Sequence, residues 1–154
     1  MGIEQDIHQA KFRNEYQKAA INLIYTFNWL TEKSRNFFAA EDITQQQFNI
    51  LRILRGSHPE PLSTLQIRDR MLDKMSDTSR IVDRLIAKGL VKKAICKSDR
   101  RLVDIMITDK GRKLLERIDL RQDEMDNLLG NLSRKEAGLL SELLDKIRES
   151  EGEK

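Results

Sequence analysis

Apolar residues recur at every third or fourth position along most of the chain, which predicts a mainly helical protein. The first such pattern covers residues 7–38 without a Gly or Pro and predicts one long helix. A second long helix is expected from Thr108 to Gly130. Shorter helices follow capping boxes, in which Ser or Thr precedes Gln or Glu by three residues: Thr44 and Gln47, Ser63 and Gln66, Ser133 and Glu136.

Residues 76–108 combine a short helical pattern with two strand patterns. Ser76 is expected to cap the helix and Gly89 to end it. Residues 90–97 and 102–107 predict two strands, and in the second of them apolar and polar residues alternate. Together with the short helices before it, this order predicts a helix-turn-helix followed by a β-hairpin.

The basic charge of the chain is concentrated in the same region. Residues 80–101 hold eight Lys or Arg and two Asp, a net charge of +6, whereas the whole chain carries +3. Arg80, Arg84 and Lys88 share one face of the predicted helix because they are spaced by four residues. A basic helix followed by a basic hairpin tip is typical of proteins that bind duplex DNA, since a helix fits the major groove and an arginine can reach the minor groove.

The predicted helix supplies the first candidate DNA-binding residues. Arg80 and Arg84 carry the planar guanidinium group that suits guanine O6 and N7. Ser76, Thr78 and Ser79 lie at the N-terminus of the helix, where hydroxyls and free backbone N–H groups suit phosphate.

A structural interpretation of the same helix face is the alternative. Arg80 could pair with Asp77 and Arg84 with Asp83, which would leave a solvated, charged face. Asp83 is in either case expected to hold one of the arginines, because a carboxylate close to phosphate is repelled unless it is paired.

The motifs of this region resemble those of the MarR family of bacterial transcription regulators. They are Arg80-Ile-Val-Asp-Arg84-Leu, Lys88-Gly89-Leu-Val, Asp99-Arg100-Arg101 and Thr108-Asp-Lys-Gly111. The D-x-R turn followed by the T-x-x-G helix start is the most specific part, and the resemblance covers nearly the whole chain. It implies a winged helix-turn-helix homodimer of a kind that often represses genes until a small molecule or an oxidant releases it.

The expected fold is therefore mainly α with a small β wing. Residues 1–154 form a single domain, in which residues 44–108 are the winged helix-turn-helix lobe that binds DNA. The long helices within residues 7–40 and 110–150 are expected to form the dimer, because their apolar stripes are hard to bury within one protomer. Two-fold symmetry then predicts a pseudo-palindromic operator with half-sites about 10–10.5 bp apart.

The wing contributes further candidates. The resemblance assigns Arg101 to the minor groove and Asp99 to holding that arginine in place. The other basic residues of the helix end and the wing are candidates for contacts with DNA: Lys88, Lys92, Lys93, Lys97 and Arg100. A generic basic turn, kept polar for solubility, is the alternative. Thr78 departs from the family pattern, which more often has an apolar residue at that position.

A ligand pocket between the dimerisation helices and the DNA-binding lobe is also implied by the resemblance. The residues expected to line it are Tyr25, Trp29, Phe37, Phe48 and Met71. Such residues at helical spacing are more often part of a core, so both interpretations stay open.

Other function classes find little support in the sequence. It has no Gly-rich phosphate loop, nucleophile elbow or acid–base pair, so we expect neither an enzyme nor a cofactor. His8 and His58 lack partners at metal-binding spacing, and Cys96 is expected to be inert rather than redox-active. Without a signal peptide or an 18-residue apolar stretch, the expected location is the cytoplasm, with no membrane partner.

The predicted function is a homodimeric, sequence-specific DNA-binding regulator, a repressor relieved by a small ligand. Two alternatives use the same fold, namely a protein-interaction module and a ligand-independent architectural DNA binder. The first should have lost the cations of its wing, which this chain retains. The second would bind specific and non-specific DNA with similar affinity.

Overall fold

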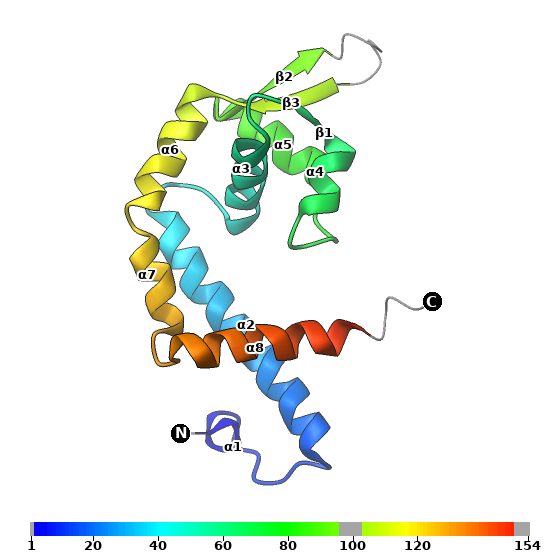
Figure 1. The fold of residues 1–154 in the computed structure, drawn as a ribbon, viewed down its shortest axis with the longest axis vertical. Coiled ribbons are helices and arrows are strands. Elements are labelled where there is room, and N and C mark those ends of the chain that lie inside the picture. The colour runs from blue at the N-terminus through cyan, green and yellow to red at the C-terminus, as the bar shows by residue number, and fades with distance from the viewer. Residues whose placement is uncertain (1, 96–102, 150–154) are drawn as a thin grey trace.

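The computed structural model describes residues 2–95 and 103–149, which form helices and one small sheet (Figure 1). The helices are α1 (Ile3–Asp6), α2 (Glu15–Ala39), α3 (Gln45–Ser57), α4 (Thr64–Arg70), α5 (Thr78–Ala87), α6 (Asp109–Asp119), α7 (Gln122–Asp126) and α8 (Arg134–Arg148), with a 3₁₀ turn η1 (Asn127–Leu129) after α7. The strands are β1 (Leu62–Ser63), β2 (Val91–Ile95) and β3 (Val103–Ile107). The predicted fold class, mainly α with a small β wing, is confirmed.

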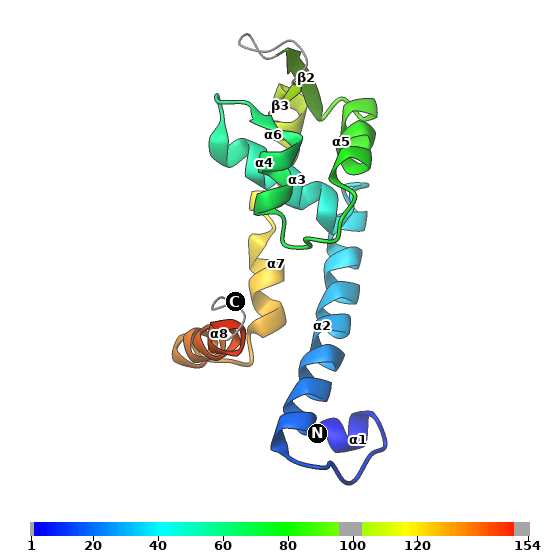
Figure 2. The same cartoon turned by 90° about the vertical axis from the view of Figure 1, so that its right-hand side faces the viewer.

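A lobe made of α3, α4, α5 and the sheet lies at one end of the molecule. Helix α2 and the α6–α7 segment extend from this lobe in the same direction as two arms (Figures 1 and 2). Helix α8 turns away at the end of the second arm, and Figure 2 shows it apart from α2. The core lies between the lobe and the adjoining ends of α2 and α6. Its fully buried apolar side chains include Ile50, Leu51, Leu54, Ile67, Leu85, Ile105, Leu115 and Ile118.

The wing is an antiparallel sheet with the strand order β1-β3-β2, in which Val91 pairs with Ile107. Ile105 and Ile107 are buried, as the alternating pattern predicted, whereas Val103 nearer the tip is exposed. Strand β1 was not predicted, because two residues are too few to show alternation. Both predicted strands also included positions within residues 96–102, which lie outside the described residues.

The first long helix begins later than the apolar pattern indicated. Helix α2 starts at Glu15 and is capped by Asn14, whose side chain accepts a hydrogen bond from the backbone N–H of Gln17 at 2.9 Å. The residues before it form α1 and a loop in which His8 has a φ of 55°. The prediction of a helix from residue 7 was therefore wrong in its first turns, because the pattern was followed past this cap.

The other helix starts follow the sequence closely. In all three capping boxes both reciprocal hydrogen bonds form, at the starts of α3, α4 and α8. Gly89 ends the α5 region with a φ of 73°, a left-handed conformation that glycine adopts without strain. None of the described helices is both long and apolar enough to cross a membrane.

The helix predicted from Thr108 to Gly130 is divided into α6, α7 and η1. The division falls where the chain leaves the lobe, since Ile118 is fully buried and Leu120 is 86% exposed. No Gly or Pro marks this position, so the continuous apolar pattern concealed it.

Candidate nucleic-acid interface

Helix α5 has one face in the core and one face in solvent. Val82 and Leu85 are buried, and the partly buried Ile81 and Ile86 pack against the same core. The exposed positions fall together on the other side of the helix, and they are Ser79, Arg80, Asp83, Arg84 and Ala87. The predicted apolar face is thereby confirmed, and it presents both arginines to solvent.

The two arginines do not pair with the neighbouring aspartates. Asp77 accepts the backbone N–H of Arg80 at 3.2 Å as a helix cap. Within the part of the chain that the structure describes, no ion pair joins Arg80 to Asp77 or Arg84 to Asp83. The open basic face is therefore favoured over the self-paired face, and Asp83 does not hold either arginine.

The N-terminus of α5 differs from expectation. The cap is Asp77 rather than Ser76, because the carboxylate accepts the helix N–H while the Ser76 hydroxyl is buried. Thr78 is 4% exposed, and neither of these two hydroxyls has a hydrogen-bond partner among the described residues. The expectation that Ser76 and Thr78 offer hydroxyls to phosphate is thus corrected, since both hydroxyls lie in the protein interior. Ser79 is exposed as expected.

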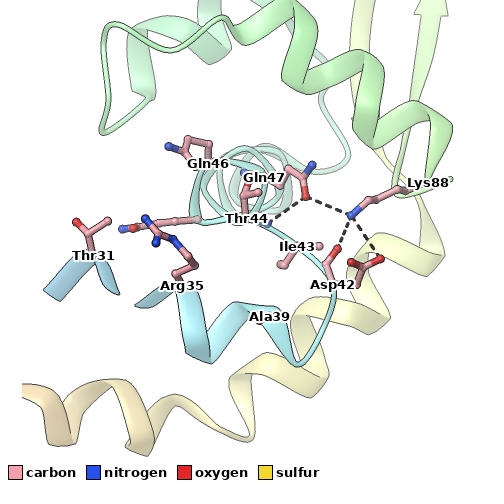
Figure 3. Close-up of a pocket in the computed structure, with 10 residues that line it drawn as sticks. Thr31, Arg35, Ala39, Asp42, Ile43, Thr44, Gln46, Gln47 and Lys88 are labelled. Atoms are coloured by element: carbon pink, nitrogen blue, oxygen red, sulfur yellow. Dashed lines mark hydrogen bonds and ion pairs between the residues drawn. The ribbon is translucent and has the colours of Figure 1, made fainter. Parts of the chain in front are cut away.

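Lys88 also departs from its expected role as a DNA contact. It is the C-cap of α5, and its ammonium group reaches back to Asp42 and Gln47 at the junction of α2 and α3 (Figure 3). Its long side chain starts beyond the last helical turn and reaches acceptors of the same chain, of which Gln47 is buried and Asp42 is exposed. The four-residue spacing from Arg80 and Arg84 placed it on their face but did not reveal these acceptors.

The described part of the wing carries two of the predicted cations. Lys92 and Lys93 are both exposed on β2. Because they are consecutive in a strand, they project from opposite faces of the sheet. The remaining wing residues singled out by the sequence lie outside the described residues, and they are Cys96, Lys97, Asp99, Arg100 and Arg101.

The T-x-x-G motif fastens the start of α6 to the end of α5. Thr108 Oγ1 donates a hydrogen bond to the carbonyl of Gly89 at 2.7 Å and accepts the N–H of Gly111 at 3.1 Å. Lys110 Nζ donates to the carbonyl of Lys88 at 2.8 Å. The position of α5 is therefore fixed from the second arm as well as from the core.

Two hollows open beside α3, at the junction of the first arm and the lobe. The larger has a volume of about 410 Å³ and is lined by residues that include Arg35, Asp42 and Lys88 (Figure 3). The smaller has a volume of about 270 Å³, and Phe27 and Met71 are among its lining residues. Three residues line both hollows, namely Thr31, Gln45 and Gln46.

Four of the five residues expected to line a ligand pocket lie elsewhere. Phe37 is buried against Phe38 with the ring centroids 5.0 Å apart, and Phe48 packs on the same ring at 4.5 Å. These residues belong to the core and its edge, which was the alternative interpretation. Tyr25 and Trp29 are partly exposed on α2 and line neither hollow.

Met71 lines the smaller hollow, as expected, but its neighbours there were missed. Phe27, Thr31 and Arg35 follow one face of α2 at four-residue spacing and contribute to the two hollows. That spacing is visible in the sequence, but Thr31 and Arg35 are polar, whereas the expected pocket residues were aromatic residues and Met71. Within residues 2–95 and 103–149, no group of three or more His, Cys, Asp or Glu is placed to bind a metal ion.

Comparison with known proteins gives matches at the level of a family. The family model described as "MarR family" matches residues 43–103. The HTH-type transcriptional regulator MhqR of Bacillus subtilis is 31% identical over 104 residues, which are 66% of this chain and 69% of that protein. The crystal structure of a MarR transcription factor from Planctomyces limnophilus is 32% identical with a TM-score of 0.67, and the match covers 88% of this chain and 98% of that one.

Two further solved structures share the fold at lower identity. A mutant MarR from E. coli, complexed with operator DNA, has a TM-score of 0.78 at 23% identity, covering 90% of this chain and 99% of that one. BpsR of Bordetella bronchiseptica, whose DNA binding is regulated by 6-hydroxynicotinic acid, has a TM-score of 0.74 at 20% identity, covering 85% of this chain and 98% of that one.

Proposed function

We propose that this chain, which belongs to the MarR family of transcription regulators, is a homodimer that represses transcription by binding a specific operator. Members of this family are DNA-binding transcription regulators and not enzymes, and some respond to a ligand. One observation carries the proposal. The exposed face of α5 presents Arg80 and Arg84, unpaired with the aspartates beside them, while Val82 and Leu85 hold the opposite face in the core.

In this proposal, residues 44–108 form the DNA-binding lobe and α5 enters the major groove. Arg80 and Arg84 then reach base edges or phosphates, at about 1–3 kcal/mol of discrimination for each bidentate contact with guanine. Lys92 or Lys93 contacts phosphate from β2, and Arg101 at the wing tip reaches the flanking minor groove. The DNA complex of the E. coli MarR supports this arrangement because that protein has the same fold.

The two arms supply the support for a homodimer. Large apolar side chains are exposed along α2 and α8, outside the lobe, and they include Tyr16, Leu23, Ile24, Phe27, Leu139, Leu140, Leu143 and Ile147. Apolar surface of this extent is typical of an interface between protein chains. A second copy that covers the arms within residues 7–40 and 110–150 gives a two-fold dimer, whose operator has half-sites about 10–10.5 bp apart.

The hollows at the junction of α2 and α3 are the proposed site of a small effector. They lie between an arm and the lobe, so an occupant would change the angle between the dimer interface and α5. The regulation of BpsR by a small aromatic acid supports a ligand-responsive repressor.

The DNA-binding proposal is tested by titrating the purified protein against its own upstream DNA at two salt concentrations. We expect tight, sequence-dependent binding that Arg84→Ala and Arg101→Ala weaken, each lowering the slope of log affinity against log salt by about 1 if a phosphate contact is lost. Arg52→Ala on α3 removes the same charge at an exposed position that the proposal places neither against DNA nor in the dimer interface, and it should leave the affinity unchanged. Weak binding that is indifferent to sequence would contradict the proposal and favour an interaction module.

The homodimer is tested by sedimentation of an interface variant and a matched control. Ile24→Asp places a charge on the exposed apolar face of α2 and should shift the protein from dimer to monomer. Asn22→Asp places the same charge on the opposite side of the helix, two residues away, and should leave the dimer intact. Dissociation by both variants, or by neither, would count against the proposed interface.

A further inference from the structure

Lys88 differs from the arginines of α5 because its cation, on a partly exposed side chain, is held by acceptors of the same chain (Figure 3). Its Nζ donates a hydrogen bond to the carbonyl of Asp42, and it lies 3.5 Å from Gln47 Oε1 and 3.8 Å from Asp42 Oδ2. Its own backbone carbonyl accepts a hydrogen bond from Lys110 of α6 at 2.8 Å. Lys88 therefore connects the end of α5 to both arms at one point.

The groups that receive the Lys88 cation are themselves held in place. Gln47 is 5% exposed, and its Oε1 also accepts the backbone N–H of Thr44 at 3.1 Å. Next to Asp42, the carboxylate of Glu41 accepts hydrogen bonds from Arg117 of α6 at 3.2 and 3.3 Å. The Asp42 carboxylate is fully exposed, but Gln47 and the backbone of the α2–α3 turn are held in this way. The contact of Lys88 with them therefore restrains the end of α5.

This restraint acts at the junction of the first arm and the lobe. The first arm meets the lobe at the turn between α2 and α3. Lys88 binds Asp42 in this turn, although the two residues are 46 positions apart in the sequence. A rotation of the lobe about this turn would have to break the contact. In a two-fold dimer joined through the arms, the same rotation changes the separation of the two α5 helices.

We propose that Lys88 is a positioning residue that sets the half-site spacing accepted by this protein. The proposal rests on the proposed DNA-binding homodimer. Two helices fit successive major grooves on one side of the duplex only when they are one helical turn, about 34–36 Å, or a multiple of it, apart. A contact that fixes the angle between arm and lobe therefore selects the spacing without touching DNA.

The test selects binding sequences from a pool of random duplex DNA with four proteins. These are the wild type, Lys88→Met, the conservative Lys88→Arg, and Lys113→Met, which removes the charge of an exposed lysine on α6. We expect the wild type and Lys113→Met to prefer one spacing between half-sites. Lys88→Met should keep the half-site sequence but lose about 3- to 10-fold of that preference, as expected for one lost hydrogen bond, and Lys88→Arg should restore it.

Two results would overturn the proposal while the proposed function stands. The first is that Lys88→Met selects the wild-type spacing with undiminished preference. The second is that Lys88→Met loses affinity equally for every spacing and lowers the salt slope by about 1, as the loss of a phosphate contact would. A wild type that selects no sequence would instead contradict the proposed function.

A second measurement follows the separation of the two α5 helices without DNA. Nitroxide labels are attached at Ser79→Cys in a Cys96→Ser background, and the distance between the labels in the dimer is measured by pulsed electron paramagnetic resonance. Ser79 is exposed on α5, so the label does not disturb the core. A broader or shifted distance distribution in Lys88→Met supports the proposal, and an identical distribution overturns it.

Discussion

Arg55 of α3 and Asp119 of α6 form a two-point ion pair across 64 residues of sequence. Arg55 Nη1 lies 2.7 Å from Asp119 Oδ2, and Nη2 lies 3.3 Å from Oδ1. The pair fastens α6 to the lobe at its last residue, immediately before the exposed Leu120. It holds the second arm one residue after Ile118, which is fully buried in the core.

The strength of this ion pair can be measured by a double-mutant cycle with Arg55→Ala and Asp119→Ala. Their side chains are 37% and 45% exposed, so solvent screens the attraction, and we expect a coupling of about 0.5–1 kcal/mol in the free energy of unfolding. The coupling should shrink at about 1 M salt, where the Debye length is about 3 Å. Strictly additive effects at low salt would show that the pair does not hold α6.

Gly111 is required because α6 starts directly against the wing. A Cβ at this position would overlap the carbonyl oxygen of Leu90 and lie 2.8 Å from Ile107 Cγ1. We expect Gly111→Ala to lower the free energy of unfolding by about 1–3 kcal/mol, measured in urea. Gly56→Ala is the matched control, since a Cβ there meets nothing within 4 Å and alanine should stabilise α3 by up to about 1 kcal/mol. Equal effects of the two substitutions would rule out the steric explanation.

Asp109 gives the start of α6 a dependence on pH. A hydrogen bond from Arg112, together with the charge of that arginine, lowers the pKa of the Asp109 carboxyl. Since the pKa in the folded state is lowered, the carboxylate stabilises the fold above its unfolded pKa of about 3.9 and loses this effect as pH falls through the folded value.

We therefore expect the wild type to be more stable than Asp109→Asn at pH 6, with a difference that disappears as pH falls below about 4. The difference in the free energy of unfolding is measured by urea unfolding of both proteins between pH 3 and pH 6, in steps of about half a unit. In an Arg112→Ala background, the free energies of unfolding of the proteins with and without Asp109→Asn should change with pH in parallel. A difference that persists at low pH would assign the effect to the shape of the side chain rather than to its charge.

Local features of this fold were predictable because their donors and acceptors are close in sequence. A capping box joins residues three apart, so Thr44 and Gln47 predict the start of α3 without any knowledge of the tertiary structure. The apolar face of α5 followed from the helical period in the same way, and Val82 and Leu85 are buried as that period requires.

Features that depend on distant partners were not predictable. Nothing in the sequence around Lys88 indicates that its acceptors lie at Asp42 and Gln47, more than 40 residues earlier. For Phe37 and Phe48 the sequence left a pocket lining and a core position both open, and their packing on Phe38 decides for the core. In each case the residue type was consistent with a functional role, and only the tertiary structure shows which contacts the side chain makes.

Thr78 offers the clearest separation of a structural role from a DNA contact. Its side chain is buried at the first position of α5, and its hydroxyl has no hydrogen-bond partner among the described residues. A buried hydroxyl without a partner costs about 1–3 kcal/mol, whereas valine has the same shape without the polar atom. Thr78→Val should therefore raise the free energy of unfolding by about 1 kcal/mol or more, while the exposed Ser79→Ala should change it by less than about 0.5 kcal/mol. Titration with operator DNA separates the two roles. We expect Thr78→Val to bind with unchanged affinity, whereas a phosphate contact through the hydroxyl would make its affinity lower.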